Sequence, residues 1–277
     1  MHVLSIYISS FEVNKVPNRN KYKEAKSDYC MEVLIITIIF IVGLASGFLG
    51  ATVGGGGMIS LPALLFLGFS PQSAIAINKV GDVGAFISAI RQYWKSKLID
   101  WQMAAPLAIV VIIGSLIGTQ IMVRLDTFIL EDVIGIVILF FLPFIFLSRK
   151  MGINQKNTSK TKKYIGMILY FLLAVEGAII GAGGAAAILL IMMYFFGYEI
   201  IKGYATNTPS ELFSALVPAI IYAFHGFVQL LPAIIIFFGM LIGGFIGSNT
   251  AITNGNLWVK SLFSIVILIS VAKMLVF

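Results

Sequence analysis

Polar side chains interrupt the long apolar stretches of this sequence, and they are the residues that could do chemistry. They occur in two short segments: Asn78, Lys79 and Asp82 in AIAINKVGD (74 to 82), and Asn207, Thr208 and Glu211 in GYATNTPSE (203 to 211). Ionisable groups at membrane depth are costly unless paired or hydrated, so they usually face a cavity. We expect an anion site in which Asn78 and Asn207 donate hydrogen bonds and Lys79 supplies charge. Alternatively, Lys79 and Asp82 only neutralise each other, three residues apart on a helix near an interface.

Two glycine clusters indicate a second source of anion-binding groups. Their candidate binding residues are Gly54, Gly55 and Gly56 in GGGG (54 to 57), and Gly183 and Gly184 in GAGGA (181 to 185). Each glycine in a helix costs about 1 kcal/mol relative to alanine, so four in a row disfavour a continuous helix. A break would leave backbone N–H donors at the start of the next half-helix, where the helix dipole also favours an anion. The alternative is close helix packing, which we favour for Gly114xxxGly118 and Gly243xxxGly247.

Three carboxyl groups are candidates for proton coupling: Glu176, Asp82 and Glu211. Glu176 lies within an apolar span, just before the second glycine cluster. A carboxyl group at that depth is expected to face a cavity and could exchange a proton there. The alternative for Glu176 is a structural hydrogen bond to a backbone N–H that the break sets free. Four aromatic residues fit a membrane-interface belt better than a substrate cage: Trp94, Trp101, Tyr93 and Tyr222.

The composition of the chain is that of a membrane protein. Of its 277 residues 59% are hydrophobic and 11% are charged, whereas about a quarter are charged in soluble domains. Several apolar runs approach the roughly 20 residues that a helix needs to cross about 30 Å of hydrocarbon. The runs do not alternate polar with apolar residues, which favours helices over a barrel. One cysteine, Cys30, and two histidines give no disulfide or zinc site, and no cofactor is expected.

Apolar segments form two series of five, at about 32 to 51, 56 to 68, 73 to 94, 103 to 122 and 128 to 147, and at 164 to 182, 184 to 197, 203 to 225, 230 to 251 and 257 to 277. Basic residues gather before residue 27, in RQYWKSK (91 to 97) and in 149 to 163. The net charge of +7 is therefore taken as a record of orientation, not of nucleic-acid binding. Four crossings per half put all three basic groups inside, with 56 to 68 too short to cross.

The expected fold is an all-α membrane protein with about eight transmembrane helices in two four-helix repeats, each with a re-entrant or broken helix at its glycine-rich motif. The parts are a cytoplasmic tail (1–31), a first transmembrane repeat (32–148), a basic cytoplasmic linker (149–163) and a second repeat (164–277). Both termini are expected in the cytoplasm, and the protein in the cytoplasmic membrane.

The two halves align without a gap at a constant offset of 129 residues from about residue 54 to residue 118. Matched pairs include Gly54 with Gly183 and Asn78 with Asn207, and Asp82 falls on Glu211. An even number of crossings per half predicts parallel repeats. Transporters commonly bind substrate at such a repeat interface, beside discontinuous helices.

The pattern of motifs resembles the sulfite exporter TauE/SafE family. It consists of GxxxGxxG from Gly43, the glycine run, Pro62 and Gly68 in the short segment, the helix start at 74 to 78, KLIDW (97 to 101) and GSLIGTQIMVRL (114 to 125). The resemblance covers about residues 32 to 277. It implies about eight transmembrane helices and transport of sulfur-containing or organic anions. Ala51 and Thr52 are additions before the glycine run, and the second copy reads GAGGA.

These features together predict a secondary transporter that moves a small anion by alternating access, such as sulfite, sulfoacetate or a related sulfonate. Its partners are the anionic substrate and the lipid bilayer, without nucleic acid, and the sequence is compatible with a homo-oligomer. An anion channel is the nearest alternative. No GxxxxGK(S/T) motif for ATP is present. An intramembrane enzyme is the less favoured alternative, because no constellation of nucleophile and base is recognisable.

Overall fold

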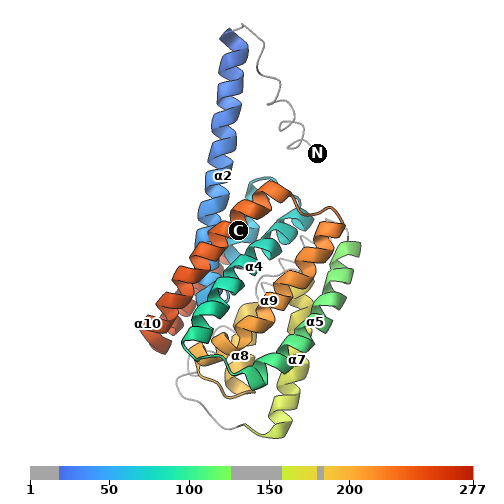
Figure 1. Ribbon diagram of the computed structural model, residues 1–277, viewed down its shortest axis with the longest axis vertical. Helices are drawn as coiled ribbons and strands as arrows, with labels where there is room; N and C mark the ends of the chain where they lie inside the picture. The colour runs from blue at the N-terminus through green and yellow to red at the C-terminus, as the bar shows by residue number, and fades with distance from the viewer. Residues whose placement is uncertain (1–18, 126–157, 180–183, 277) are drawn as a thin grey trace. The chain divides into compact units, whose positions relative to one another are not determined.

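The computed structural model describes residues 19–125, 158–179 and 184–276, and these residues are all-α apart from loops (Figure 1). The helices are α2 (Arg19–Val53), α3 (Gly57–Phe66), α4 (Pro71–Lys95), α5 (Trp101–Arg124), α7 (Lys160–Ile179), α8 (Gly184–Tyr194), α9 (Ile200–Phe224) and α10 (Leu230–Val276). The chain divides into two compact units, residues 1–38 and 39–277. The first contributes the start of α2, which begins at Arg19, within the stretch expected to be a tail. The second unit holds everything described below.

Four helical stretches in the described part of the chain are long and apolar enough to cross a membrane: Met31–Thr52, Pro71–Lys95, Trp101–Arg124 and Leu230–Val259. They make this a multi-pass membrane protein. The expected span at 128 to 147 lies outside the described residues, as does most of the expected linker, so a total of eight crossings stays a prediction. Helix α10 is kinked at Gly255 (φ 80°), which separates the expected segments at 230 to 251 and 257 to 277.

Local capping explains where the helices start. Ser70 precedes α4, accepts a hydrogen bond from the N–H of Ser73 (3.3 Å) and is followed by Pro71 at the first helical position, a combination typical of helix N-termini. Asp100 caps α5 by accepting from the N–H of Gln102 (3.1 Å). Gly68 has φ +85°, a left-handed conformation that glycine adopts readily. It follows the end of the short helix α3.

Glycines let the long helices pack so closely that their backbones are in contact. A Cβ added at Gly243 of α10 would overlap the carbonyl oxygen of Leu44 in α2, and one at Gly118 of α5 would overlap that of Val175 in α7. Gly84 of α4 also faces α10, with an added Cβ 2.6 Å from the carbonyl oxygen of Phe237. The packing interpretation of Gly114xxxGly118 and Gly243xxxGly247 is therefore confirmed.

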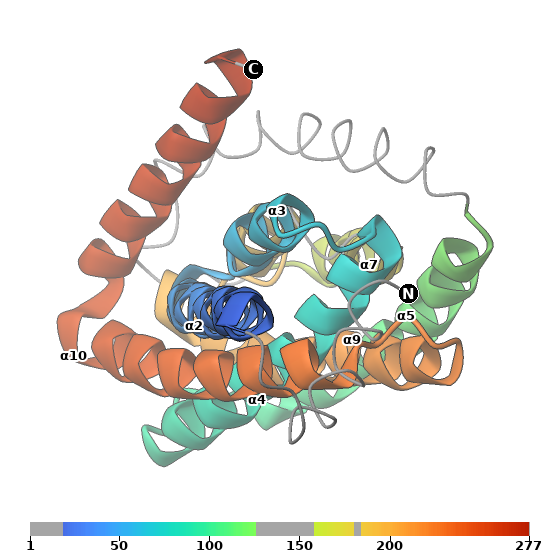
Figure 2. The same cartoon turned by 90° about the horizontal axis from the view of Figure 1, so that it is seen from above.

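These contacts fix the directions of the helices. Successive positions along α4 meet successive positions along α10, from Gly81 beside Ile236 to Ala85 and Ser88 beside Gly244, so the two helices run the same way. Helix α9 precedes α10 across a short turn and runs the opposite way to α4. Consistently, the C-terminal end of α4 meets the N-terminal end of α9 (Figures 1 and 2). The rings of Tyr93 and Tyr204 lie 6.1 Å apart there.

The matched helices of the two halves are therefore antiparallel, and the expectation of parallel repeats is wrong. Helices α5 and α7 run together, since Gly114 faces Ala174 and Gly118 faces Ala178. From residue 39 onward α2 runs with α10, because Gly43 meets Gly239. In the sequence α2 was counted as one crossing and α3 as none, but α2 and α4 both run with α10, so the chain between them, which includes α3, turns back.

Replacing Gly243 with alanine is expected to destabilise the fold by about 1–3 kcal/mol, the usual cost of forcing an extra methyl group into a packed interface. Gly177→Ala is the matched control, because its nearest neighbour outside its own helix, Ser214 Oγ, lies 3.8 Å from the added Cβ. The measurement is thermal unfolding in detergent. Equal melting temperatures for the two variants would contradict the packing account.

Candidate functional site

The first glycine cluster interrupts the helix where the sequence predicted a break. Residues 54–56 are not helical, and Gly54 has φ +76°. The N–H of Gly54 donates to the carbonyl of Leu49 (3.1 Å), and the next paired donors are Met58 and Ile59, which donate to Gly55 and Gly56 (3.2 and 3.0 Å). The N–H groups of Gly55, Gly56 and Gly57 have no acceptor in the part of the chain that the structure describes. Three donors are thus available at the start of α3.

Buried tyrosines satisfy the carbonyl groups on the other side of the break. The hydroxyl of Tyr93 donates to the carbonyl of Ala51 (2.7 Å), and that of Tyr204 donates to the carbonyl of Gly50. In the second half, Tyr222 donates to the carbonyl of Ala178 near the end of α7 (2.6 Å). Tyr93 and Tyr222 are 1% and 0% exposed, so their assignment to an interface belt is wrong. Unpaired carbonyls are costly away from water, and these hydroxyls stabilise both helix ends.

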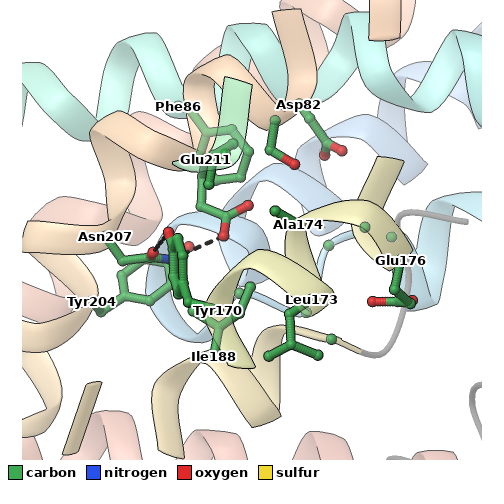
Figure 3. A pocket seen from close by; sticks show the side chains of 18 of the residues that line it. Asp82, Phe86, Tyr170, Leu173, Ala174, Glu176, Ile188, Tyr204, Asn207 and Glu211 are labelled. Carbon is green, nitrogen blue, oxygen red and sulfur yellow. Dashed lines mark hydrogen bonds between the residues drawn. The ribbon is translucent and has the colours of Figure 1, made fainter. Parts of the chain in front are cut away.

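A cavity of about 70 Å³ lies beside the first break (Figure 3). Its polar lining comes from four places: the glycine run, Lys79 and Asp82 on α4, Tyr170 and Glu176 on α7, and Tyr204, Asn207 and Glu211 on α9. Phe86, Leu173 and Ile188 supply apolar walls. A volume of this size has room for a few water molecules or one small ion.

An asparagine one turn before an acid recurs on both sides of the cavity. Asn78 Nδ2 donates to Asp82 Oδ2, and Asn207 Nδ2 donates to Glu211 Oε1, both at 2.9 Å. Each amide oxygen also accepts a hydroxyl, from Ser60 on α3 for Asn78 and from Tyr170 on α7 for Asn207. The carboxyl groups are therefore held in place, and one N–H of each amide remains for another acceptor.

Lys79 is the cation of the cavity, and it is 4% exposed. It acts electrostatically on Asp82, Glu176 and Glu211. No ion pair or hydrogen bond of its ammonium group is found among the described residues. One lysine therefore faces three carboxyl groups around the same space.

Glu176 differs from the other two acids because no described residue holds its carboxyl group by a hydrogen bond. Both oxygens are buried, and neither has a hydrogen-bond partner in the described ranges. The structural hydrogen bond considered for Glu176 in the sequence is thus not found there. Oε2 lies beside Gly184, the first residue of α8, where an added Cβ would be 2.6 Å from it.

Most of the residues singled out in the sequence meet at the cavity: Gly54, Gly55, Gly56, Lys79, Asp82, Glu176, Gly184, Asn207 and Glu211. Asn78 and Thr208 are fully buried and do not line it; Thr208 Oγ1 donates to the carbonyl of Tyr204 (2.8 Å). Gly183 lies outside the described residues. The sequence analysis missed Tyr170 and Tyr204, whose only signal was a polar group inside an apolar span.

Comparisons with known proteins agree with the membrane fold. The model of the family described as Sulfite exporter TauE/SafE matches residues 39–274. A probable membrane transporter protein of Haemophilus influenzae is 23% identical over 240 residues, 87% of this chain and 94% of the relative. The probable membrane transporter protein YfcA of Escherichia coli K12 is 21% identical over 89% of this chain and 92% of its own length. No solved structure matches.

Proposed function

The chain belongs to the sulfite exporter TauE/SafE family of membrane transporters, and on that premise we propose that it is a secondary transporter of a small anion, a sulfur oxyanion or organosulfonate such as sulfite or sulfoacetate. The observation that carries the proposal is that Lys79 lines one cavity together with three glycines whose N–H groups have no acceptor among the described residues. Backbone donors at a helix start and a buried cation are the groups that recognise an oxyanion.

Alternating access follows from the relation between the two halves. We propose that they are inverted repeats, each with a re-entrant pair of helices at its glycine-rich motif: α2 with α3, and α7 with α8. Antiparallel matched helices and a cavity lined by both halves support this arrangement. Rocking of one half against the other would then expose the cavity to one side of the membrane at a time.

Proton coupling follows from the charges. With Lys79 against Asp82, Glu176 and Glu211, a monovalent anion is accommodated only when carboxyl groups are protonated. We therefore assign Asp82, Glu176 and Glu211 to proton coupling, and the glycine break, Lys79 and Asn207 to the anion. Asn78 acts indirectly, by holding Asp82.

The proposed orientation places the end with Lys95, Lys97 and the start of α7 in the cytoplasm. Helices α5 and α7 run in the same direction, so the α4–α5 turn and Lys160, Lys162 and Lys163 lie at one end. Such a concentration of cations is typical of the cytoplasmic side. From residue 39 onward α2 runs with α10 and therefore with α4, toward the proposed cytoplasmic end, so this orientation disagrees with the expected cytoplasmic N-terminus. Location in the cytoplasmic membrane and a cytoplasmic C-terminus stay predictions.

The test is uptake into proteoliposomes with a panel of sulfite, thiosulfate, sulfonates and carboxylates under an imposed pH gradient. The expected result is saturable uptake of a sulfur anion, with exchange against the same anion inside. Current through single molecules, without saturation or exchange, would indicate the anion channel instead. No flux of any anion would reject the proposal.

Replacing Asn207 with alanine is expected to weaken anion affinity about tenfold or more, since a hydrogen bond to a charged group contributes about 1.5–3 kcal/mol. Asn78→Ala is the matched control on the other half, because it breaks the same kind of amide to acid contact without touching the cavity lining. The half-saturating anion concentration is the measurement. An unchanged value in Asn207→Ala would remove this amide from the site.

A further inference from the structure

The glycine-rich motifs of the two halves differ in one respect that the repeat makes visible. Glu176 precedes the second motif, and the residue 129 positions earlier, just before the aligned stretch of the first half, is Gly47. Gly47 packs on the backbone of Met240 and leaves no room for a side chain. Only the second half therefore carries an acid at this position. The start of α3 is open to the cavity through its glycine N–H groups, whereas the start of α8 has a carboxylate of the protein beside it.

The Glu176 carboxyl group lies beside Gly184, where α8 begins, and no N–H group of the described part of α8 donates to it. Oε2 lies where the side chain of any residue but glycine would begin at Gly184, and both oxygens are buried without a partner in the described part of the chain. Figure 3 shows the Glu176 carboxyl group among the side chains that line the cavity. An ionised carboxylate is favoured at that end of a helix dipole, and so is any anion of similar size.

We propose that Glu176 is a tethered competitor of the transported anion. In its ionised form it occupies the start of α8, beside Gly184. When it takes up a proton it no longer competes, and an anion from the cavity binds at the start of α8 in its place. This inference rests on the proposed anion transport and adds a reason for its coupling: the anion and the Glu176 charge exclude each other, so each anion bound there requires one proton.

The surrounding groups determine the direction of the effect. Lys79 and Asp82 on α4 and Glu211 on α9 line the same cavity, together with the hydroxyls of Tyr170 and Tyr204. Lys79 attracts the ionised Glu176 and the anion alike, while Glu211 opposes both. These neighbours therefore act in the same way on the Glu176 carboxylate and on the transported anion. Only protonation of Glu176 changes which of the two occupies the position. Lower pH favours the protonated acid, so it is expected to tighten anion binding.

The decisive variant is Glu176→Gln, studied in proteoliposomes with thiosulfate or a sulfonate, whichever the wild-type protein transports, because these anions keep their charge near neutral pH. In the wild type, affinity is expected to rise by up to tenfold per unit fall in pH for each proton taken up. Glu176→Gln should reduce that slope by one proton and bind the anion at alkaline pH as tightly as the wild type does at acidic pH. Glu32→Gln, a carboxyl group outside the cavity lining, should keep the wild-type slope.

Gly184→Ala provides a second route to the same result, since its methyl group would displace the end of the flexible Glu176 side chain. It should also lower the slope. If the wild type transports and both variants keep its pH dependence, or if Glu176→Gln binds weakly at every pH, the competitor role is overturned while anion transport stands. If the wild type moves no anion, the proposed function fails and the inference falls with it.

Discussion

Lys79→Met is expected to abolish saturable anion transport. Methionine keeps the length of the side chain and removes the cation, which leaves Asp82, Glu176 and Glu211 around the cavity without a counter-charge. Removing one partner from a buried group of charges costs about 2–5 kcal/mol, which corresponds to a loss of affinity of about thirtyfold or more. The anion would also meet only negative or neutral groups.

The measurement is the initial rate of uptake over a range of anion concentrations. Lys95→Met is the matched control on the same helix, because Lys95 is exposed at the C-terminal end of α4 and should leave uptake unchanged. Lys79→Arg, which retains the charge, should recover part of the activity. Normal uptake by Lys79→Met protein would show that the anion binds elsewhere.

Glu211→Gln is expected to reduce accumulation driven by a pH gradient while exchange of internal for external anion continues. The amide can still accept the 2.9 Å hydrogen bond that Asn207 donates, so the local geometry is retained. It cannot take up and release a proton, however, and the neighbouring acids then cannot store the same free energy from the gradient. Asp82→Asn should behave alike, because Asn78 holds Asp82 in the same way.

The two modes are separated by loading vesicles with unlabelled anion. Counterflow without a gradient should persist in Glu211→Gln, and the steady-state ratio of internal to external anion under a gradient should fall below that of the wild type. Glu211→Asp, which restores an ionisable group, should regain accumulation. A Glu211→Gln protein that concentrates the anion as far as the wild type does would exclude this carboxyl group from proton coupling.

The sequence predicted the membrane class, the position of the first helix break and the charged residues around the cavity. These follow from local physics: four consecutive glycines disfavour a helix, and ionisable groups within apolar spans require a polar space. The match of Asn78 with Asn207 and of Asp82 with Glu211 further indicated that two distant segments share one role.

The sequence did not predict the relative direction of the halves or the partners of the break. Direction was inferred from charge and from counting spans, and the count treated α2 as a full crossing although the chain turns back between α2 and α4. The tyrosines were misplaced because a hydroxyl that reaches a carbonyl many residues away, as Tyr204 reaches Gly50, depends on how helices cross. The composition of the sequence and the spacing of its residues do not show how the helices cross.

Equilibrium binding tests the central claim most directly, namely that an anion binds at the glycine break beside Lys79. Purified wild-type protein should bind the radiolabelled anion that it transports at a saturable site, and Lys79→Met protein of equal thermal stability should bind it at least about thirtyfold more weakly. Equal binding by the two proteins would contradict the claim.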